Sequence, residues 1–226
     1  MIEKNLQQVM ENINRAAEEA RRDPTSIKLV AVTKTFPAAT VEQAYAAGIT
    51  HVGENKLQEA VSKMEAVNAP LNWHFIGHLQ TNKVKDVVGR FFMLHSLDRL
   101  RLAKELAKWA AKRDTTVRAL VQVNTSGEAS KYGLPPEDLK DFLIELKNFD
   151  NINIQGLMTM APWAANPEET RPFFRRLREL KEQIDIPGID LKILSMGMTN
   201  DYHVAIEEGA NLIRVGTAIF GNRANY

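Results

Sequence analysis

Short apolar runs alternate with amphipathic segments along almost the whole chain, and no other feature constrains the fold as strongly. Each apolar run has the length and the side chains of a buried strand, and each amphipathic segment has the three- and four-residue spacing of a helix. Strands separated by single helices are predicted to be parallel, with right-handed crossovers. The eight expected strands are Leu29–Thr33, His51–Gly53, Trp73–Ile76, Phe92–His95, Val117–Val123, Ile152–Met158, Lys192–Leu194 and Leu212–Val215.

Eight strand–helix units favour a closed (β/α)8 TIM barrel over an open doubly wound sheet. An extra N-terminal helix is expected over residues 2–22, where Asp23 and Pro24 end it. No low-complexity linker divides the chain, so we expect one domain over residues 1–226. The helices expected between the strands are Val41–Ala47, Lys56–Val67, Asn82–Val88, Leu100–Lys112, Pro136–Leu146, Pro167–Ile184 and Tyr202–Glu207.

The composition fits such a barrel and argues against several other classes of protein. Apolar residues make up 44% of the chain and the formal net charge is +1, so no dedicated nucleic-acid or membrane surface is expected. There is no cysteine, which excludes disulfides, thiolate metal sites and a cysteine nucleophile. No apolar stretch reaches the ~20 residues of a membrane span, and the N-terminus lacks the apolar core of a signal peptide. We therefore expect a cytoplasmic protein.

One lysine lies at the end of the expected barrel where the active sites of barrel enzymes are found. Lys34 directly follows the first expected strand, at the end where the functional loops of these barrels lie. A lysine at the mouth of a buried strand can lose its charge through desolvation and condense with a carbonyl compound. A solvated lysine at a strand end is the alternative.

Two segments near the C-terminus have the composition of a phosphate site. The seventh expected strand leads into residues 195–201 (Ser-Met-Gly-Met-Thr-Asn-Asp), and the eighth leads into Gly216 and Thr217. Both segments provide hydroxyls, glycines and backbone amides, which a phosphate monoester requires. Tight turns use the same residue types, but barrels favour these two loops for phosphate.

A carbonyl-binding lysine and a phosphate site on one rim suggest pyridoxal 5′-phosphate (PLP), although a sugar-phosphate aldolase would need the same two parts. Arg214 helps to separate them, because it lies just before Gly216 and could reach a pyridine nitrogen. An arginine there would donate a hydrogen bond and weaken the cofactor as an electron sink. A structural ion pair is the other role open to Arg214.

Several motifs are spread over nearly the whole chain. The most specific are residues 73–80 (Trp-His-Phe-Ile-Gly-His-Leu-Gln) and residues 195–198 (Ser-Met-Gly-Met). Because of these motifs, the chain resembles the pyridoxal-phosphate homeostasis protein family. The fold of that family is similar to the barrel domain of alanine racemase (fold-type III). The other motifs that carry the resemblance are residues 31–34, 53–55, 123–128, 156–160 and 214–221.

The resemblance implies a role for each site residue. Lys34 would hold PLP as a Schiff base, and Arg214 would face the pyridine nitrogen. Thr199 occupies a position that is often serine in the family, and the hydroxyl is retained. No catalytic residue is implied. The phosphate would be held by Ser195, Thr199, Gly216 and Thr217, and the pocket would be lined by Asn55 and His74.

The resemblance also implies a cytosolic protein, monomeric or weakly associating, that serves vitamin B6 and amino-acid homeostasis without robust enzymatic activity. Alanine racemase uses a tyrosine from a second, β-rich domain of its partner subunit, and few residues follow the last expected strand here. A racemase needs acid–base groups on both faces of its substrate, and Lys34 could serve only one. We expect a PLP carrier that delivers to apo-enzymes; a PLP-dependent racemase and a PLP-responsive regulatory protein are the alternatives.

Other residues have less specific interpretations. The five histidines show no metal-ligand spacing, so no metal site is expected. Asn55 could instead cap the helix that begins near Lys56. Residues 131–133 either gate the pocket or form a solvated loop, and the basic outer face of the helix at 167–184 is expected to be solvated.

Overall fold

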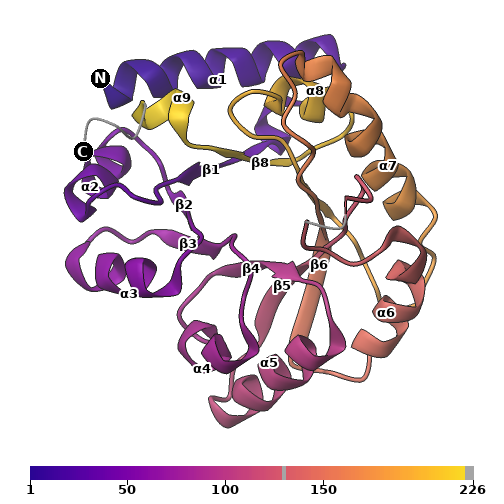
Figure 1. Ribbon diagram of the computed structural model, residues 1–226. Helices are drawn as coiled ribbons and strands as arrows, with labels where there is room; N and C mark the ends of the chain where they lie inside the picture. Colours follow the sequence, from indigo (N-terminus) through magenta and orange to yellow (C-terminus); the bar gives the residue numbers. More distant parts are fainter. Residues whose placement is uncertain (129–130, 222–226) are drawn as a thin grey trace.

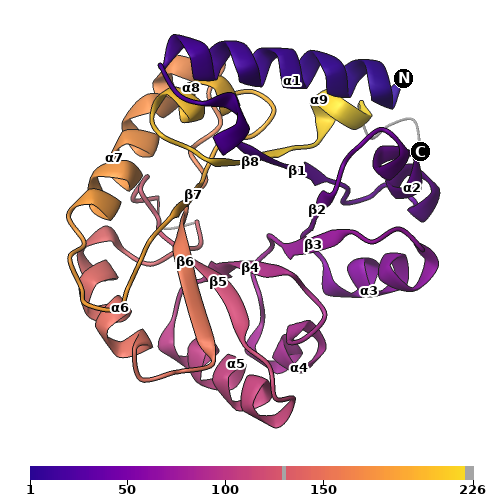
Figure 2. The same cartoon turned by 180° about the vertical axis from the view of Figure 1, so that it is seen from behind.

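The eight strands form one closed parallel barrel and follow one another around the ring in sequence order (Figures 1 and 2). The computed structural model describes residues 1–128 and 131–221. Strand β8 closes the ring against β1, with Ala31 opposite Val215. The predicted (β/α)8 barrel is therefore confirmed. The strands are β1 (Lys28–Val32), β2 (His51–Glu54), β3 (Asn72–Phe75), β4 (Met93–Leu97), β5 (Val117–Gln122), β6 (Ile152–Met158), β7 (Ile193–Ser195) and β8 (Leu212–Val215).

The helices surround the strands on the outside of the ring, as both views show. The expected N-terminal helix is present as α1, and a short helix, α9, follows β8. Within the described ranges, no helix is both long and apolar enough to cross a membrane. The helices are α1 (Ile2–Glu19), α2 (Ala38–Ala46), α3 (Leu57–Ala66), α4 (Val84–Val87), α5 (Leu100–Lys112), α6 (Leu139–Leu146), α7 (Arg171–Glu182), α8 (Tyr202–Glu207) and α9 (Thr217–Phe220).

Most observed boundaries differ from the expected ones by a few residues; α2, for example, begins at Ala38 and not at Val41. Short 3₁₀ turns over Thr81–Lys83, Pro136–Asp138 and Pro167–Thr170 precede α4, α6 and α7. The last two begin with proline, which suits a first turn because its fixed φ fits and its missing N–H would have no partner there. Strand β7 was expected to end at Leu194 but continues to Ser195. Ser195 therefore belongs to the barrel wall and not to the loop after it.

Apolar side chains fill two separate layers. The larger core lies between the strands and the helices, where α5 buries four apolar residues at helical spacing. A small cluster of Met93, Leu120 and Met158 is separate from it. The strands approach closely at Gly156 of β6, where a Cβ would lie 2.0 Å from the carbonyl oxygen of Ile193, so only glycine fits.

Helix α1 packs against the C-terminal part of the barrel and is hydrogen-bonded to it. It packs against α8 and α9, and Asn5 Nδ2 donates to the carbonyl of Ile219 (2.9 Å). Arg22, just beyond the helix, donates to the carbonyls of Ile206 (2.6 Å) and Ala210 (2.7 Å). Each large apolar side chain that α1 buries stabilises this contact by about 1.5–3 kcal/mol. Its buried residues are Leu6, Val9, Ile13, Ala16 and Ala17.

Candidate functional site

Lys34 lies in a tight turn at the C-terminal end of β1. The Thr33 N–H donates to the carbonyl of Gly53 in β2 (3.1 Å), and the Phe36 N–H donates to the carbonyl of Thr33 (3.1 Å). Thr35 has a φ of +71°, a backbone conformation that few residues other than glycine adopt. Lys34 itself is half-buried. The lysine therefore stands at the rim of the barrel on a well-defined turn.

A buried ion-pair network fixes the backbone on both sides of Lys34. Glu54 is fully buried, and its Oε1 accepts hydrogen bonds from Lys63 Nζ (2.8 Å) and Thr33 Oγ1 (2.6 Å). Lys63 Nζ also donates to the Thr33 carbonyl (2.7 Å) and to Glu59 Oε1 (2.6 Å). Glu59 in turn accepts a hydrogen bond from the Thr35 N–H. We call Glu54, Glu59 and Lys63 the acid–lysine clamp.

Of the two carboxylates of the clamp, Glu54 is fully buried and Glu59 is half-buried. Burial raises the pKa of Glu54, while hydrogen bonds from Lys63 and Thr33 act in the opposite direction. The second oxygen of Glu54, Oε2, is buried without a hydrogen-bond partner in the described structure. Lys63 is therefore the group that makes a charged Glu54 tolerable beneath the Lys34 turn.

The loops after β7 and β8 meet beside the end of β1. The Ala218 N–H donates to Thr199 Oγ1 (3.4 Å), which joins the two loops. Gly216 lies against β1, since a Cβ on it would come within 3.2 Å of the carbonyl oxygen of Val32. Thr199 is half-buried and Thr217 is exposed. We call Thr199, Gly216 and Thr217 the hydroxyl–glycine cradle.

The loop after β7 is tied tightly to α8. Asp201 Oδ1 accepts a hydrogen bond from the Met198 N–H (2.6 Å), and burial raises the pKa of Asp201. Gly197 has a φ of +90°, and a Cβ there would lie 2.7 Å from the Cβ of Ala205. Glycine is required at this position for both reasons, and Thr199 is presented by a rigid turn.

Arg214, in β8, is buried behind this cradle. Its Nη1 donates to Ser195 Oγ (2.5 Å) and its Nη2 donates to the carbonyl of Thr159 (2.9 Å). Within the described chain no carboxylate forms an ion pair with Arg214, so the structural ion pair considered as an alternative is absent there. Burial lowers the pKa of Arg214 to about 10, which leaves it charged at neutral pH.

Three histidines on neighbouring strands continue this network through the barrel interior. His95 Nδ1 lies 3.1 Å from Ser195 Oγ, and His95 Nε2 lies 2.8 Å from His74 Nδ1. His74 Nε2 lies 2.9 Å from Nδ1 of His51, which is half-buried at the start of β2. We call His51, His74 and His95 the histidine column. It connects the N-terminal mouth of the barrel to Ser195 and, through it, to Arg214.

Two of the predicted cofactor ligands are buried in the barrel interior. Ser195 is fully buried between Arg214 and His95, because β7 extends to it and directs its side chain inward. His74 is 1% exposed and lies between the other two histidines. Ser195 contacts Arg214 directly, and His74 is linked to Ser195 through His95.

Asn55 follows β2 at the same rim as Lys34. It does not cap α3, because the N-cap position is Lys56 and no side chain makes a capping hydrogen bond there; the capping alternative is wrong. Asn55 lines a cavity of about 890 Å³ between α3 and the loop after β3. A Cβ on Gly77 would lie 2.2 Å from the Asn55 carbonyl oxygen, so the two loops touch.

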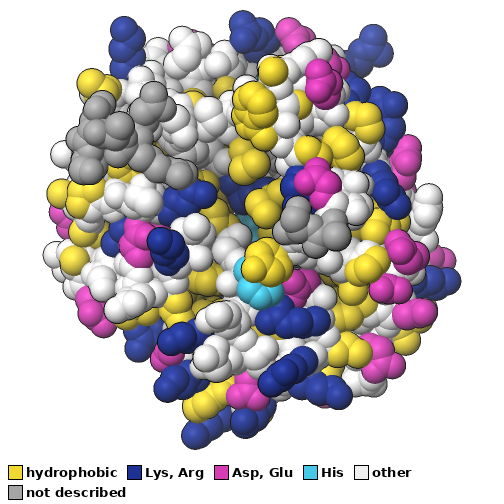
Figure 3. Space-filling view, viewed as in Figure 1, with side chains coloured by type: hydrophobic (Ala, Val, Ile, Leu, Met, Phe, Trp, Pro, Cys, Tyr) yellow, Lys and Arg dark blue, Asp and Glu magenta, His cyan; other side chains and the backbone are white. Residues whose placement is uncertain are grey.

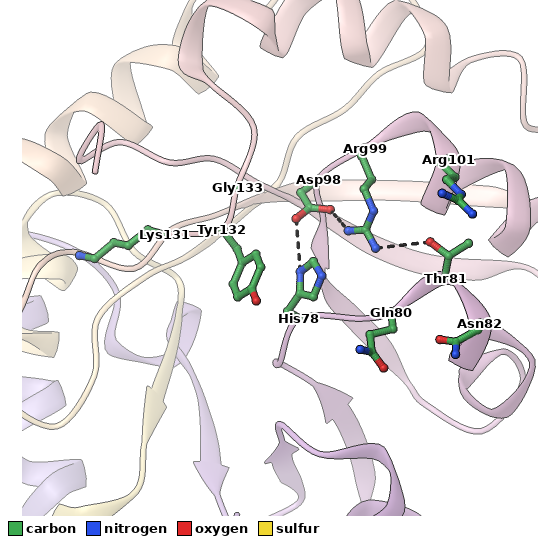
Figure 4. Close-up of a pocket in the computed structure, with 10 residues that line it drawn as sticks. All are labelled: His78, Gln80, Thr81, Asn82, Asp98, Arg99, Arg101, Lys131, Tyr132 and Gly133. Atoms are coloured by element: carbon green, nitrogen blue, oxygen red, sulfur yellow. Dashed lines mark hydrogen bonds and ion pairs between the residues drawn. The ribbon is translucent and has the colours of Figure 1, made fainter. Parts of the chain in front are cut away.

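A second cavity, of about 680 Å³, opens beside the first (Figure 4). His78 and Tyr132 stack in it with ring centroids 3.9 Å apart, and His78 faces Asp98, which also pairs with Arg99 (2.5 Å). Tyr132 of the loop at residues 131–133 thus contacts the loop after β3 while 57% of its surface stays exposed. Seen as in Figure 1, the surface is hollowed near the centre of the ring (Figure 3).

Acidification is expected to destabilise the fold through the histidine column. Burial lowers the pKa of His74 from 6.5 to about 3, so the unfolded chain takes up a proton first as the pH falls. Stability from neutral His74 is complete above pH 6.5 and is lost on going from there towards pH 3. At pH 5 the loss amounts to about 2 kcal/mol.

Denaturant unfolding at pH 7 and pH 5 measures this loss. The difference between the two pH values should be smaller by about 2 kcal/mol in His74→Asn than in the wild type, since asparagine does not titrate. His203→Gln, which alters a histidine outside the column, is the matched control. Equal losses in wild type and His74→Asn would contradict the prediction.

Sequence reasoning missed the acid–lysine clamp and the histidine column. One local signal for the clamp was available, because Glu59 and Lys63 are spaced i, i+4 on a helix and can pair. No local signal existed for the column, since His51, His74 and His95 come from three strands. The described residues contain no group of three or more His, Cys, Asp or Glu placed to hold a metal ion.

Comparison with known proteins identifies the relatives of this chain. The model of the family "Alanine racemase, N-terminal domain" matches residues 5–224. The pyridoxal phosphate homeostasis protein of Aquifex aeolicus is 44% identical over 220 residues, covering 96% of each chain. Among solved structures, PipY of Synechococcus elongatus, described with PLP bound, is 36% identical with a TM-score of 0.85, covering 98% of this chain and 100% of PipY.

A more distant structure has the same barrel. Alanine racemase of Clostridium difficile superimposes with a TM-score of 0.75 at 17% identity, covering 97% of this chain and 56% of the racemase. At this identity the likeness concerns the fold alone. The relatives at 44% identity over nearly the full length carry the assignment: the chain belongs to the pyridoxal phosphate homeostasis protein family, built on the alanine racemase N-terminal domain.

Proposed function

We propose that this protein binds PLP reversibly and serves intracellular PLP and amino-acid homeostasis. One observation carries the proposal: a rim lysine, a buried arginine and a hydroxyl–glycine cradle come together at the ends of β1, β8 and β7. These are the groups that an aldehyde, a pyridine nitrogen and a phosphate need. The PLP-bound structure of PipY, 36% identical over the same barrel, supports the proposal.

Each group has a distinct role in the proposed site. Lys34 would hold the cofactor through its aldehyde carbon, and the Thr199, Gly216 and Thr217 cradle would receive the phosphate. Arg214 would donate a hydrogen bond to the ring nitrogen and, because it stays charged, would disfavour protonation there. The bound cofactor supplies an electron-withdrawing ring, and this arginine reduces that capacity.

We propose different roles for two of the predicted residues. We assign Ser195 to holding Arg214 and not to the phosphate, because its hydroxyl is enclosed between Arg214 and His95. We assign His74 to the column behind Arg214 and not to the pocket wall. Asn55 keeps its proposed place at the pocket rim, on the loop that follows β2.

A carrier fits better than an amino-acid racemase. The relatives at 44% identity are named homeostasis proteins, whereas the 17% identity to alanine racemase concerns the fold alone. A charged arginine at the ring nitrogen would reduce the electron-withdrawing capacity of the ring, which suits retention of the cofactor more than carbanion chemistry. We further propose a cytoplasmic monomer that passes PLP to apo-enzymes.

Three measurements on the purified protein test the function. Added PLP should produce a visible absorbance band that persists through gel filtration. Mixing the loaded protein with a PLP-requiring apo-enzyme should restore that enzyme's activity. Single L-amino acids incubated with the loaded protein in D2O should show no rapid Cα–deuterium exchange. Absence of the band would overturn PLP binding, and rapid exchange would overturn the carrier in favour of a racemase.

A further inference from the structure

The histidine column is a continuous chain of hydrogen bonds that crosses the barrel interior. It begins at His51, the first residue of β2, and passes through His74 and His95 to Ser195, the last residue of β7. Because all strands are parallel, its two ends lie towards opposite mouths of the barrel. His74 and His95 are almost fully buried, so every ring nitrogen inside the column has only protein partners.

The hydrogen bonds of the column can be donated in either of two directions. A neutral imidazole carries one N–H and one acceptor nitrogen, so neighbouring rings can share a contact only if all of them point the same way. We call one direction inward: hydrogen bonds are donated from the Ser195 end towards His51. In this direction Ser195 donates to His95, His95 donates to His74, and His74 donates to His51. In the outward direction, every one of these hydrogen bonds is reversed.

Ser195 decides between the two directions. Its oxygen accepts a hydrogen bond from Arg214 in either case, and its hydroxyl hydrogen needs an acceptor of its own. In the inward direction that acceptor is His95 Nδ1. In the outward direction His95 becomes a donor, and no other acceptor contacts Ser195 in the described structure. A buried donor without a partner is costly, so the resting protein adopts the inward direction.

The far end of the column can reverse it. A protonated His51 carries hydrogens on both ring nitrogens, so its Nδ1 must donate to His74. His74 must then donate to His95, and His95 to Ser195. The hydroxyl hydrogen of Ser195 is forced out of the column, next to the guanidinium of Arg214. Protonation at one mouth of the barrel therefore alters the group that holds Arg214.

We propose that the histidine column is a pH-responsive positioning device, in which the protonation state of His51 sets how firmly Ser195 holds Arg214. The device itself is independent of the cofactor. Only its effect on PLP rests on the proposed function, because Arg214 is the residue assigned to the ring nitrogen.

Burial and the charges around the column set the pH range of the switch. At the His51 end, Lys28 of β1 acts on His51 and His74, and Arg118 of β5 lies over the Phe92 ring that both histidines contact. Burial and then Lys28 lower the pKa of His51. At the other end, Asp201 opposes the burial of Arg214. The switch therefore operates on the acid side of pH 6.5.

Histidine tautomers report the direction of the column without any cofactor. Long-range ¹⁵N–¹H NMR of histidine-labelled wild type should show His74 and His95 with their hydrogen on Nε2 at pH 8. As His51 takes up a proton, both should move to the Nδ1-H form with the same midpoint. In His51→Gln, which cannot be protonated, neither should change. Tautomers that stay fixed while His51 titrates in the wild type would overturn the proposal without the use of any variant.

PLP affinity tests the link to the cofactor site. The PLP dissociation constant of the wild type, divided by that of His51→Gln, should rise about tenfold as the pH falls through the His51 midpoint. The ratio of wild type to His203→Gln should stay constant, because His203 lies outside the column. A constant wild-type to His51→Gln ratio would overturn the positioning role.

The two proposals fail in different ways. If PLP binds but the tautomers do not switch, the column is static and the proposed function stands. If the tautomers switch but PLP does not bind, the column stands and the proposed function fails. Far-UV circular dichroism of each variant at each pH shows that the folded protein is being compared.

Discussion

Replacing Lys34 with alanine is expected to abolish covalent PLP uptake, because no other amine stands on the turn that closes β1. The variant should stay colourless after incubation with PLP and gel filtration. Borohydride treatment, which fixes a lysine-linked cofactor irreversibly, should label the Lys34 peptide of the wild type and no peptide of the variant. Stability should change little, since Lys34 is only half-buried.

Two further variants sharpen this test. Lys34→Arg keeps the positive charge but cannot form the covalent link, so it should also remain colourless; colour in this variant would mean that charge alone retains the cofactor. Lys56→Ala removes an exposed lysine of the same rim and should bind PLP like the wild type. Borohydride labelling of Lys34→Ala at another lysine would contradict the assignment of the anchor.

Replacing Lys63 with methionine is expected to be the most destabilising single substitution proposed for this chain. It would leave Glu54 fully buried without a cation, and breaking a buried pair in this way costs about 3–5 kcal/mol. Denaturant unfolding at pH 7 measures the loss. The substitution also removes two hydrogen bonds that hold the Lys34 turn. Lys63 Nζ no longer donates to the Thr33 carbonyl, and it no longer pairs with Glu59, which binds the Thr35 N–H. PLP affinity should therefore fall as well.

A double variant shows whether the buried charge is the cause. Glu54→Gln combined with Lys63→Met removes both charges and should recover a large part of the stability that Lys63→Met loses. Lys108→Met breaks an exposed pair with Glu105 and should cost less than about 1 kcal/mol. If the double variant were as unstable as Lys63→Met, lost packing and not the stranded carboxylate would be responsible.

Much of the architecture could be read from the sequence because it depends on local periodicity. The runs that became β6 and β8 were predicted with their observed bounds, as were α5 and α8. The errors are at element ends, where neighbours decide. Strand β7 gains Ser195 because Met158 of β6 pairs with it, and this single residue moves its hydroxyl from the predicted phosphate loop into the barrel.

The sequence by itself determined that this chain forms a (β/α)8 barrel with an amine at the end of its first strand and a hydroxyl–glycine cradle after its last two strands. Those features are properties of short segments, so side-chain spacing and turn composition reveal them. Only the tertiary structure decided what lies behind the rim. The clamp joins β2 to α3. The histidine column, Ser195 and Arg214 form one hydrogen-bonded network that draws one residue from each of five strands. Such contacts depend on strand register and on which face of each strand points inward, and closing the barrel is what fixes both.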